Sequence, residues 1–136
     1  MSVPNAWEVD SGMAAKRIFS GEEAARTAML DAKRHIHTNV LATGEHLQLI
    51  WARYEPSAEY TLHTHEHEQF SVLLQGRMRL TVGDEVREIG PGDMWHAPAN
   101  VPHGGEILGA EEVVFIDIYG PPSRTILDYV ERLRGN

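Results

Sequence analysis

The sequence feature that most constrains this chain is a run of metal-binding residue types at alternate positions: His63, His65, His67 and Gln69. Side chains at alternate positions of a β-strand point to the same face. A strand would therefore crowd these four donors onto one wall of whatever it lines. Imidazole nitrogens and an amide oxygen suit a borderline divalent transition metal. The run predicts a metal site, with a chance cluster of surface histidines as the alternative.

Composition excludes several classes of protein. The chain has 136 residues, 42% of them apolar, and a net charge of −8, which predicts one soluble domain and argues against nucleic acid or an anionic membrane as partner. It has no cysteine, so disulfides and thiolate ligands are excluded. Because it shows neither a long apolar run nor a signal-peptide pattern, we expect a cytoplasmic protein.

The chain divides into an N-terminal arm (1–32), a β-rich core (about 33–120) and a C-terminal helix (125–134). In the arm we expect irregular sequence around Trp7, a short strand over 16–19 and a helix of about ten residues reaching Ala32. Ser20 and Glu23 have the spacing of a helix-capping box.

Short strands separated by Gly and Pro turns fill the core and predict an antiparallel sandwich or barrel, an all-β fold. Phe70 to Leu74 is expected to enter the core, and Gly76 to close that strand with a turn. The expected strands cover 32–42, 46–55, 60–75, 77–82, 86–89, 94–97 and 113–119, and His103 opens a further strand.

Two segments resemble the paired motifs of the cupin superfamily. The first is His63-x-His65-x3-Gln69-x6-Gly76, with Gln where Glu is usual. The second is Gly92-x5-Pro98-x-Asn100-x2-His103, with Asn100 where Gly is common and Ile107 in place of a final Asn. The resemblance implies a double-stranded β-helix (jelly-roll) barrel that holds a metal inside its mouth.

The resemblance also implies a ligand set of His63, His65, Gln69 and His103, with one divalent transition metal ion per chain. His67 matches no ligand position, so we interpret it as a residue beside the ligands or facing the substrate. We interpret the other histidines as structural: His35, His37 and His46 at the surface or a subunit contact, and His96 in a turn.

Gln69 makes the implied ligand shell neutral, so the ion keeps its full charge and polarises a bound oxygen more strongly than a shell with Glu would allow. Neutral shells suit Mn, Fe, Ni, Zn or Cu, and affinity alone does not select among them. Four protein ligands leave up to two positions open on an octahedral ion, which is typical of a catalytic site.

The strand over 113–119 contributes the candidate catalytic groups. Asp117 interrupts an apolar strand. Burying an ionised carboxylate there costs free energy unless it forms an ion pair or has a catalytic function. We interpret Asp117 as a general acid or base, with a buried ion pair as the alternative. Tyr119 lies on the same side and could donate a proton, while Arg53 or Arg124 could bind a carboxylate unless they form surface salt bridges.

Within the superfamily, Gln69 and the ending from Asp117 to Arg124 resemble the pectin-degradation cupins, which linearise unsaturated uronates into open-chain keto acids. That group ends Asp-x-Phe-x-Pro-Pro-Arg. Here Tyr119 replaces the Phe, and Ser123 displaces the arginine by one residue to Arg124.

Three functions remain open: a Lewis-acid isomerase or lyase acting on a small oxygenated molecule, a non-haem metal oxygenase, and a binding cupin without turnover. The expected partners are a small-molecule substrate and a second copy of the chain. We expect the homodimer to use the N-terminal strands to close the partner's sheet, because unpaired edge strands need covering.

Overall fold

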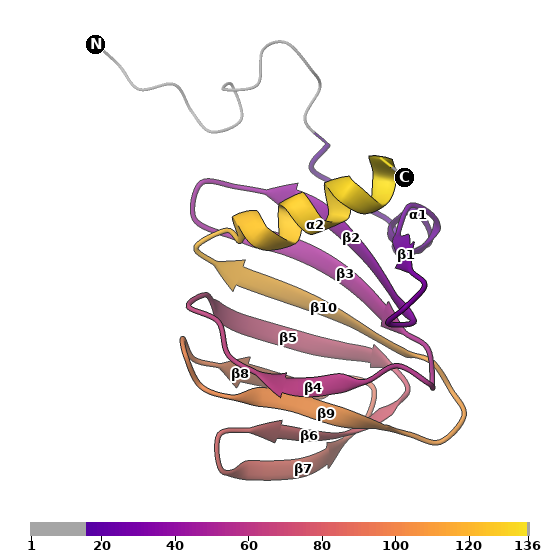
Figure 1. The fold of residues 1–136 in the computed structure, drawn as a ribbon, viewed down its shortest axis with the longest axis vertical. Helices are drawn as coiled ribbons and strands as arrows, with labels where there is room; N and C mark the ends of the chain where they lie inside the picture. The colour runs from indigo at the N-terminus through magenta and orange to yellow at the C-terminus, as the bar shows by residue number, and fades with distance from the viewer. Residues whose placement is uncertain (1–15, 136) are drawn as a thin grey trace.

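The computed structural model describes residues 16–135. The arm around Trp7 lies outside the described residues. Figure 1 shows the chain as two β-sheets with a helix near each end. The elements are α1 (Gly21–Arg26), β1 (Met29–Asp31), β2 (Ile36–Thr43), β3 (Gln48–Tyr54), β4 (Tyr60–His63), β5 (Glu68–Gln75), β6 (Arg77–Val82), β7 (Glu85–Ile89), β8 (Met94–Ala97), β9 (His103–Leu108), β10 (Val113–Gly120) and α2 (Arg124–Gly135).

The strands form a six-stranded sheet in the order β1-β2-β3-β10-β5-β8 and a four-stranded sheet in the order β4-β9-β6-β7. All neighbouring strands are antiparallel. The chain crosses between the sheets from β4 to β5, and again from β5 to β6. This confirms the all-β fold that the strand pattern predicts and the double-stranded β-helix that the resemblance implies, with a short helix at each end.

The core lies between the two sheets. It is built from inward-facing residues of both, among them Leu73 of β5, Met78 of β6 and Phe115 of β10, each at most 1% exposed. The prediction that all of Phe70 to Leu74 enters the core is wrong. Because a strand alternates its side chains, Leu73 faces inward, whereas Phe70 and Leu74 are each 49% exposed on the opposite face.

The N-terminal elements differ from the prediction in length. The capping box is confirmed, since the Ser20 hydroxyl accepts from the Glu23 N–H and the Glu23 carboxylate accepts from the Ser20 N–H. The helix nevertheless ends at Arg26 rather than Ala32, because Met29–Asp31 pairs with β2 as an edge strand. Residues 16–19 form no strand.

The backbone conformation of two turns explains why Gly76 and Asn100 occupy their motif positions. Gly76 has a φ of +85°, and a Cβ there would lie 2.6 Å from the Glu112 carbonyl oxygen, so only glycine fits. Asn100 has a φ of +65°, in the left-handed region where Asn is the best tolerated residue after Gly. The departure from the motif's usual glycine therefore preserves the backbone conformation.

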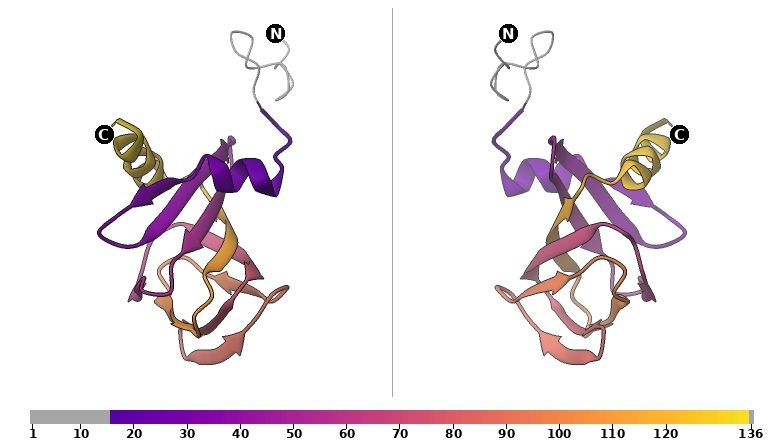
Figure 2. Two further views of the ribbon diagram at one scale, coloured as in Figure 1. Left: turned by 90° about the vertical axis from the view of Figure 1, so that its right-hand side faces the viewer. Right: turned by 90° about the vertical axis from the view of Figure 1, so that its left-hand side faces the viewer.

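The two helices lie on opposite sides of the six-stranded sheet (Figure 2). On the outer side, Ala24 of α1 packs against Trp51 and Val114. On the inner side, α2 contacts β1 and β2 and buries Val130. The predicted C-terminal helix is confirmed, with one more residue at each end.

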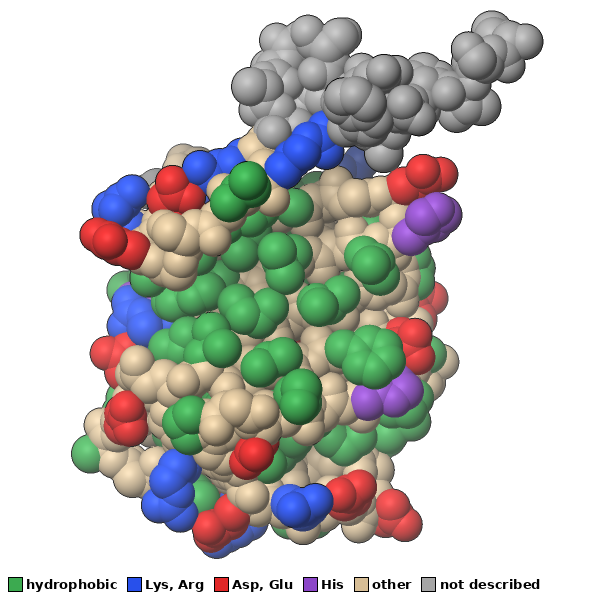
Figure 3. Space-filling view, turned by 180° about the vertical axis from the view of Figure 1, so that it is seen from behind, with side chains coloured by type: hydrophobic (Ala, Val, Ile, Leu, Met, Phe, Trp, Pro, Cys, Tyr) green, Lys and Arg blue, Asp and Glu red, His purple; other side chains and the backbone are tan. Residues whose placement is uncertain are grey.

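The rest of the outer face of the six-stranded sheet is apolar and exposed (Figure 3). Phe70, Leu74 and Met94 are 49%, 49% and 71% exposed there. His96, expected in a turn, lies on β8 instead, where its ring stacks on Phe70. No helix among residues 16–135 is long and apolar enough to cross a membrane.

Candidate metal centre

Three histidines converge between the sheets. His63 ends β4, His103 opens β9 directly opposite it, and His65 lies in the loop between β4 and β5. One ring nitrogen from each lies within 4.8 Å of the other two. Gln69, near the start of β5, approaches from the six-stranded sheet. Its Oε1 lies 3.1 Å from Nε2 of His65 and 3.1 Å from Nε2 of His103.

Backbone carbonyls fix how the three rings present their nitrogens. Nδ1 of His63 donates to the Thr61 carbonyl at 2.8 Å, Nδ1 of His65 to the His67 carbonyl at 2.7 Å, and Nδ1 of His103 to the Val101 carbonyl at 2.9 Å. A carbonyl can only accept, so each Nδ1 carries the proton. In the neutral rings each Nε2 then presents a lone pair, the arrangement found around metal-ligating histidines.

Gln69 is oriented just as firmly. Its Nε2 donates to the Ser71 hydroxyl at 2.9 Å and to Oδ1 of Asp117 at 3.1 Å, which turns Oε1 toward the histidines. The site therefore gathers acceptors with no proton between them, an arrangement that a cation stabilises. Burial also lowers the pKa of His103 and favours its neutral form. This donor set fits a divalent transition metal ion.

His67 lies outside this group. Its Nδ1 donates to the Pro121 carbonyl at 2.8 Å, and its ring stacks on Tyr119 at 6.1 Å between centroids. The picture of one strand carrying all four donors is wrong, because β4 ends at His63 and β5 begins at Glu68. Between them the chain bends, and the Asn100 N–H holds the His65 carbonyl at 2.8 Å.

Asp117 lies directly behind Gln69. It is 6% exposed, and its carboxylate accepts hydrogen bonds from Ser71 and Gln69. Burial raises the pKa of Asp117 to about 7, although the two hydrogen bonds oppose the rise. No Lys or Arg among residues 16–135 pairs with it, so the alternative of a buried ion pair is wrong.

A cavity of about 380 Å³ opens onto the histidines. Its walls come from both sheets, from the turn between β1 and β2, and from α2. Tyr119 lines it, and burial raises the pKa of that phenol well above its usual value, so the phenol stays protonated. The lining residues are Arg34, Ile36, Thr38, Tyr54, Tyr60, Thr61, His63, His65, His67, Tyr119, Ser123, Thr125, Ile126, Tyr129 and Arg132.

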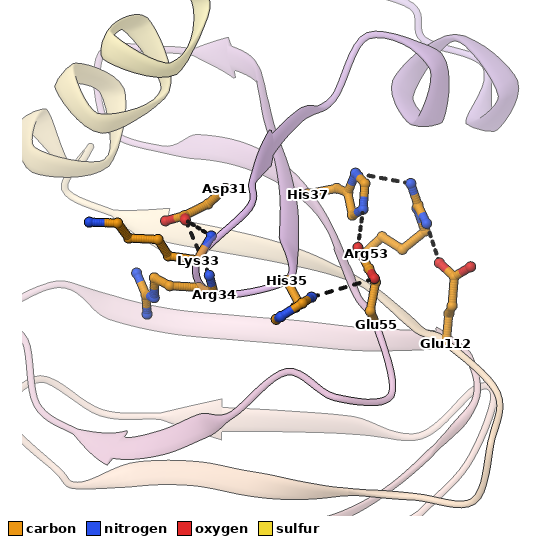
Figure 4. Close-up of polar contacts among 8 residues, drawn as sticks. All are labelled: Asp31, Lys33, Arg34, His35, His37, Arg53, Glu55 and Glu112. Carbon is orange, nitrogen blue, oxygen red and sulfur yellow. Dashed lines mark hydrogen bonds and ion pairs between the residues drawn. The ribbon is translucent and has the colours of Figure 1, made fainter. Parts of the chain in front are cut away.

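The arginines singled out from the sequence do not line this cavity. Arg53 forms a salt bridge with Glu112 and contacts Nδ1 of His37 on the outer side of the sheet (Figure 4). For Arg53, the alternative of a salt bridge is therefore the one observed. Arg124 is exposed at the start of α2 and is not among the lining residues. Arg34 and Arg132 line the cavity instead, and no sequence signal pointed to them.

Sequence reasoning also missed Ser71, whose hydroxyl donates a hydrogen bond to the Asp117 carboxylate. The strand alternation could have found it, because Ser71 is two residues from Gln69 and therefore shares its face.

The fold and the cluster together define a double-stranded β-helix protein with a histidine and glutamine site at its centre. The chain belongs to the cupin family: residues 50–119 match the family model described as Cupin domain. KdgF from Halomonas sp. is a similar structure, with 26% identity and a TM-score of 0.67 over 75% of this chain and 94% of that chain.

Two further similarities are more distant or shorter. An RmlC-like cupin from Shewanella frigidimarina NCIMB 400 has 22% identity and a TM-score of 0.70 over 82% of this chain and 96% of that chain, a likeness of fold. Oxalate decarboxylase OxdC of Bacillus subtilis (strain 168) is 30% identical over 91 residues, or 62% of this chain. The matched part is 24% of that enzyme's length, so this chain spans only about a quarter of it.

The raised pKa of Asp117 predicts a pH-dependent stability of the metal-free protein. The unfolded chain loses this proton near the ordinary value of 3.8, whereas the folded protein keeps it to about 7. Between these values the unfolded state binds fewer protons, so the free energy of unfolding contributed by Asp117 falls as pH rises. We expect Asp117→Asn to remove this loss. Between these two pKa values, the difference in free energy of unfolding between variant and wild type should therefore grow in favour of the variant by up to about 1.4 kcal/mol per pH unit.

Urea unfolding of both chelator-treated proteins across this window measures the gain. Comparing variant with wild type cancels the titration of the histidines, which both proteins share. Asp84→Asn removes an exposed carboxylate and is the matched control. Parallel stability profiles for wild type and Asp117→Asn would contradict the assigned environment of Asp117.

Proposed function

We propose that this cupin is a metal-dependent enzyme that isomerises or cleaves a small oxygenated, sugar-acid-like molecule. The observation that carries the proposal is the convergence of one ring nitrogen each from His63, His65 and His103 with the Gln69 Oε1, beside a cavity that His63 and His65 line. His63, His65, Gln69 and His103 would hold one divalent ion. When bound there, such an ion supplies Lewis acidity toward a carbonyl or hydroxyl oxygen of the substrate.

The side chains around the cavity support proton transfer. Opening a cyclic hemiacetal with a neighbouring double bond removes a proton from a hydroxyl oxygen, breaks the ring C–O bond and adds a proton to carbon. Atoms and electrons balance without an oxidant. Tyr119, protonated and facing the cavity, can donate a proton or a hydrogen bond.

His67 and Asp117 complete this arrangement. Nδ1 of His67 is engaged by the Pro121 carbonyl, which leaves its Nε2 as an acceptor within the cavity. Asp117, expected as a general acid or base, has a pKa raised to about 7 by burial, but it lies behind Gln69 and is not among the residues that line the cavity. Its hydrogen bond to Gln69 gives it a second role, since it holds the amide oxygen toward the histidines.

The resemblance to pectin-degradation cupins, together with the similarity to KdgF over most of both chains, supports an unsaturated uronate as the first substrate to test. A non-haem oxygenase is the second candidate, because the same neutral shell suits reducible metals. A binding cupin without turnover is the third.

One experiment separates the three candidates. The chelator-treated protein is reloaded with Zn, Mn, Ni or Fe and given an unsaturated uronate, while the ultraviolet absorbance of its double bond and dissolved oxygen are recorded together. The proposal expects loss of absorbance with redox-inert Zn and no oxygen consumption. Turnover that requires Fe or Mn and consumes oxygen would show the oxygenase, and ligand binding without any turnover would show the binding protein.

We also propose that the chain forms a homodimer, as the sequence predicts from its N-terminal edge strands. In the fold, β1 is the edge of the six-stranded sheet. Light scattering at micromolar concentration checks the assembly, and a monomer mass would contradict it.

A further inference from the structure

The cavity that His63, His65 and His67 line has an unusual charge for this protein. The chain carries 20 acidic and 12 basic residues. Yet no Asp or Glu is among the residues that line the cavity, while two arginines and three histidines are. By contrast, a cavity of about 520 Å³ between β7 and β8 is lined by residues of both signs, including Glu85, Arg87 and Asp93. An acid-free cavity in an acidic protein concentrates positive potential at one place.

The two arginines reach this cavity from opposite parts of the chain. Arg34 lies in the turn between β1 and β2, and Arg132 lies on α2. Within residues 16–135 neither guanidinium forms an ion pair, whereas Arg53, Arg77 and Arg79 each bind a glutamate. Exposed arginines are commonly just solvated, but these two converge on the same cavity from positions far apart in sequence.

Asp31 is the acid closest to Arg34 in sequence. Its charge lies near Arg34, but it forms no ion pair with that guanidinium, and its hydrogen bonds come from a tyrosine hydroxyl and from backbone N–H groups. Its carboxylate accepts from the Tyr129 hydroxyl at 2.7 Å and from the backbone N–H groups of Lys33 and Arg34 at 3.1 and 3.2 Å. Figure 4 shows these backbone bonds, with no bond from Asp31 to the Arg34 guanidinium. The Tyr129 bond ties the turn to α2, so it also holds the two arginine-bearing elements together.

We propose that Arg34 and Arg132 bind the carboxylate of a small organic anion whose reactive oxygen faces the three histidines. This inference rests on the proposed function and adds the residues that select its substrate. An arginine fork matches a carboxylate in charge and geometry. A cavity of about 380 Å³ accommodates a molecule of monosaccharide size. The four ligand residues themselves carry no negative charge that would repel such an anion.

The test measures binding without requiring turnover. Zinc-loaded and chelator-treated proteins are titrated by calorimetry with D-glucuronate and with D-glucose, which differ by a carboxylate in place of a hydroxymethyl group. Wild type is expected to bind the acid more tightly than the sugar in both forms. Arg34→Gln and Arg132→Gln should each weaken glucuronate binding roughly 10- to 100-fold, as expected for one charged hydrogen-bonding partner, and leave glucose binding unchanged.

Arg87→Gln removes the same charge on the four-stranded sheet and controls for long-range electrostatics. Arg124→Gln tests the arginine that the sequence favoured. Equal binding of acid and sugar by wild type, or no binding of the acid, would overturn the proposal. So would a loss confined to Arg124→Gln. Failure of the protein to bind zinc, with the arginine effects intact, would instead contradict the metal-dependent function alone.

Discussion

His63→Ala, His65→Ala and His103→Ala are each expected to abolish stoichiometric binding of a divalent metal ion. Each substitution removes one of the three ring nitrogens that lie within 4.8 Å of one another. Loss even of a group that orients a ligand typically costs 10- to 100-fold in metal affinity, so loss of a ligand should cost at least about 100-fold. Titration of Zn into the metal-free variants, with bound metal counted per chain, measures this.

His67→Ala is the matched control, because it removes an imidazole from the same segment but from outside the group of three. It should bind metal with near wild-type stoichiometry. If it behaves like the other three variants, the ligand set is wrong. His103 is fully buried, so its replacement could also weaken folding. His103→Leu, which fills more of the space without offering a ligand atom, and thermal unfolding of all the metal-free variants distinguish loss of a ligand from loss of the fold.

Gln69→Glu should retain the metal and lose turnover. The added carboxylate holds a divalent ion at least as tightly but reduces its pull on a substrate oxygen. The substitution would also place a second carboxylate next to Asp117. Gln69 Nε2 donates to Asp117 Oδ1 at 3.1 Å, and in the variant a carboxylate oxygen would take its place. Two buried carboxylates at this distance cannot both ionise, so one must keep its proton near neutral pH.

We therefore expect metal-free Gln69→Glu to be less stable than wild type at neutral and higher pH, and the difference to shrink in acid. Adding Asp117→Asn should restore most of the lost stability, because an amide can donate to the new carboxylate. Thermal unfolding of the single and double variants across pH measures this coupling. Metal content and turnover are measured on the same preparations. Undiminished non-oxidative turnover in Gln69→Glu would count against the Lewis-acid function.

The two motifs made the fold predictable because their residues act through local geometry. Gly76 and Asn100 adopt positive φ values that few other residues tolerate, and so they fix turns wherever the chain carries them. Alternation likewise predicted that Phe115, Asp117 and Tyr119 share a face. It could not say which face of β5 would be buried, because burial depends on which sheet packs above it.

The sequence by itself determined the cupin fold, the positions of His63, His65, Gln69 and His103, and the presence of an acid in β10. The fold and the ligand set came from the resemblance of two motifs to those of the cupins, and the acid came from its place in an apolar strand. Only the tertiary structure decided what surrounds them. It placed Asp117 behind Gln69 and brought Arg34 and Arg132 to one cavity. Residues so far apart in sequence meet only because two sheets and a helix pack together, and strand periodicity carries no information about that packing.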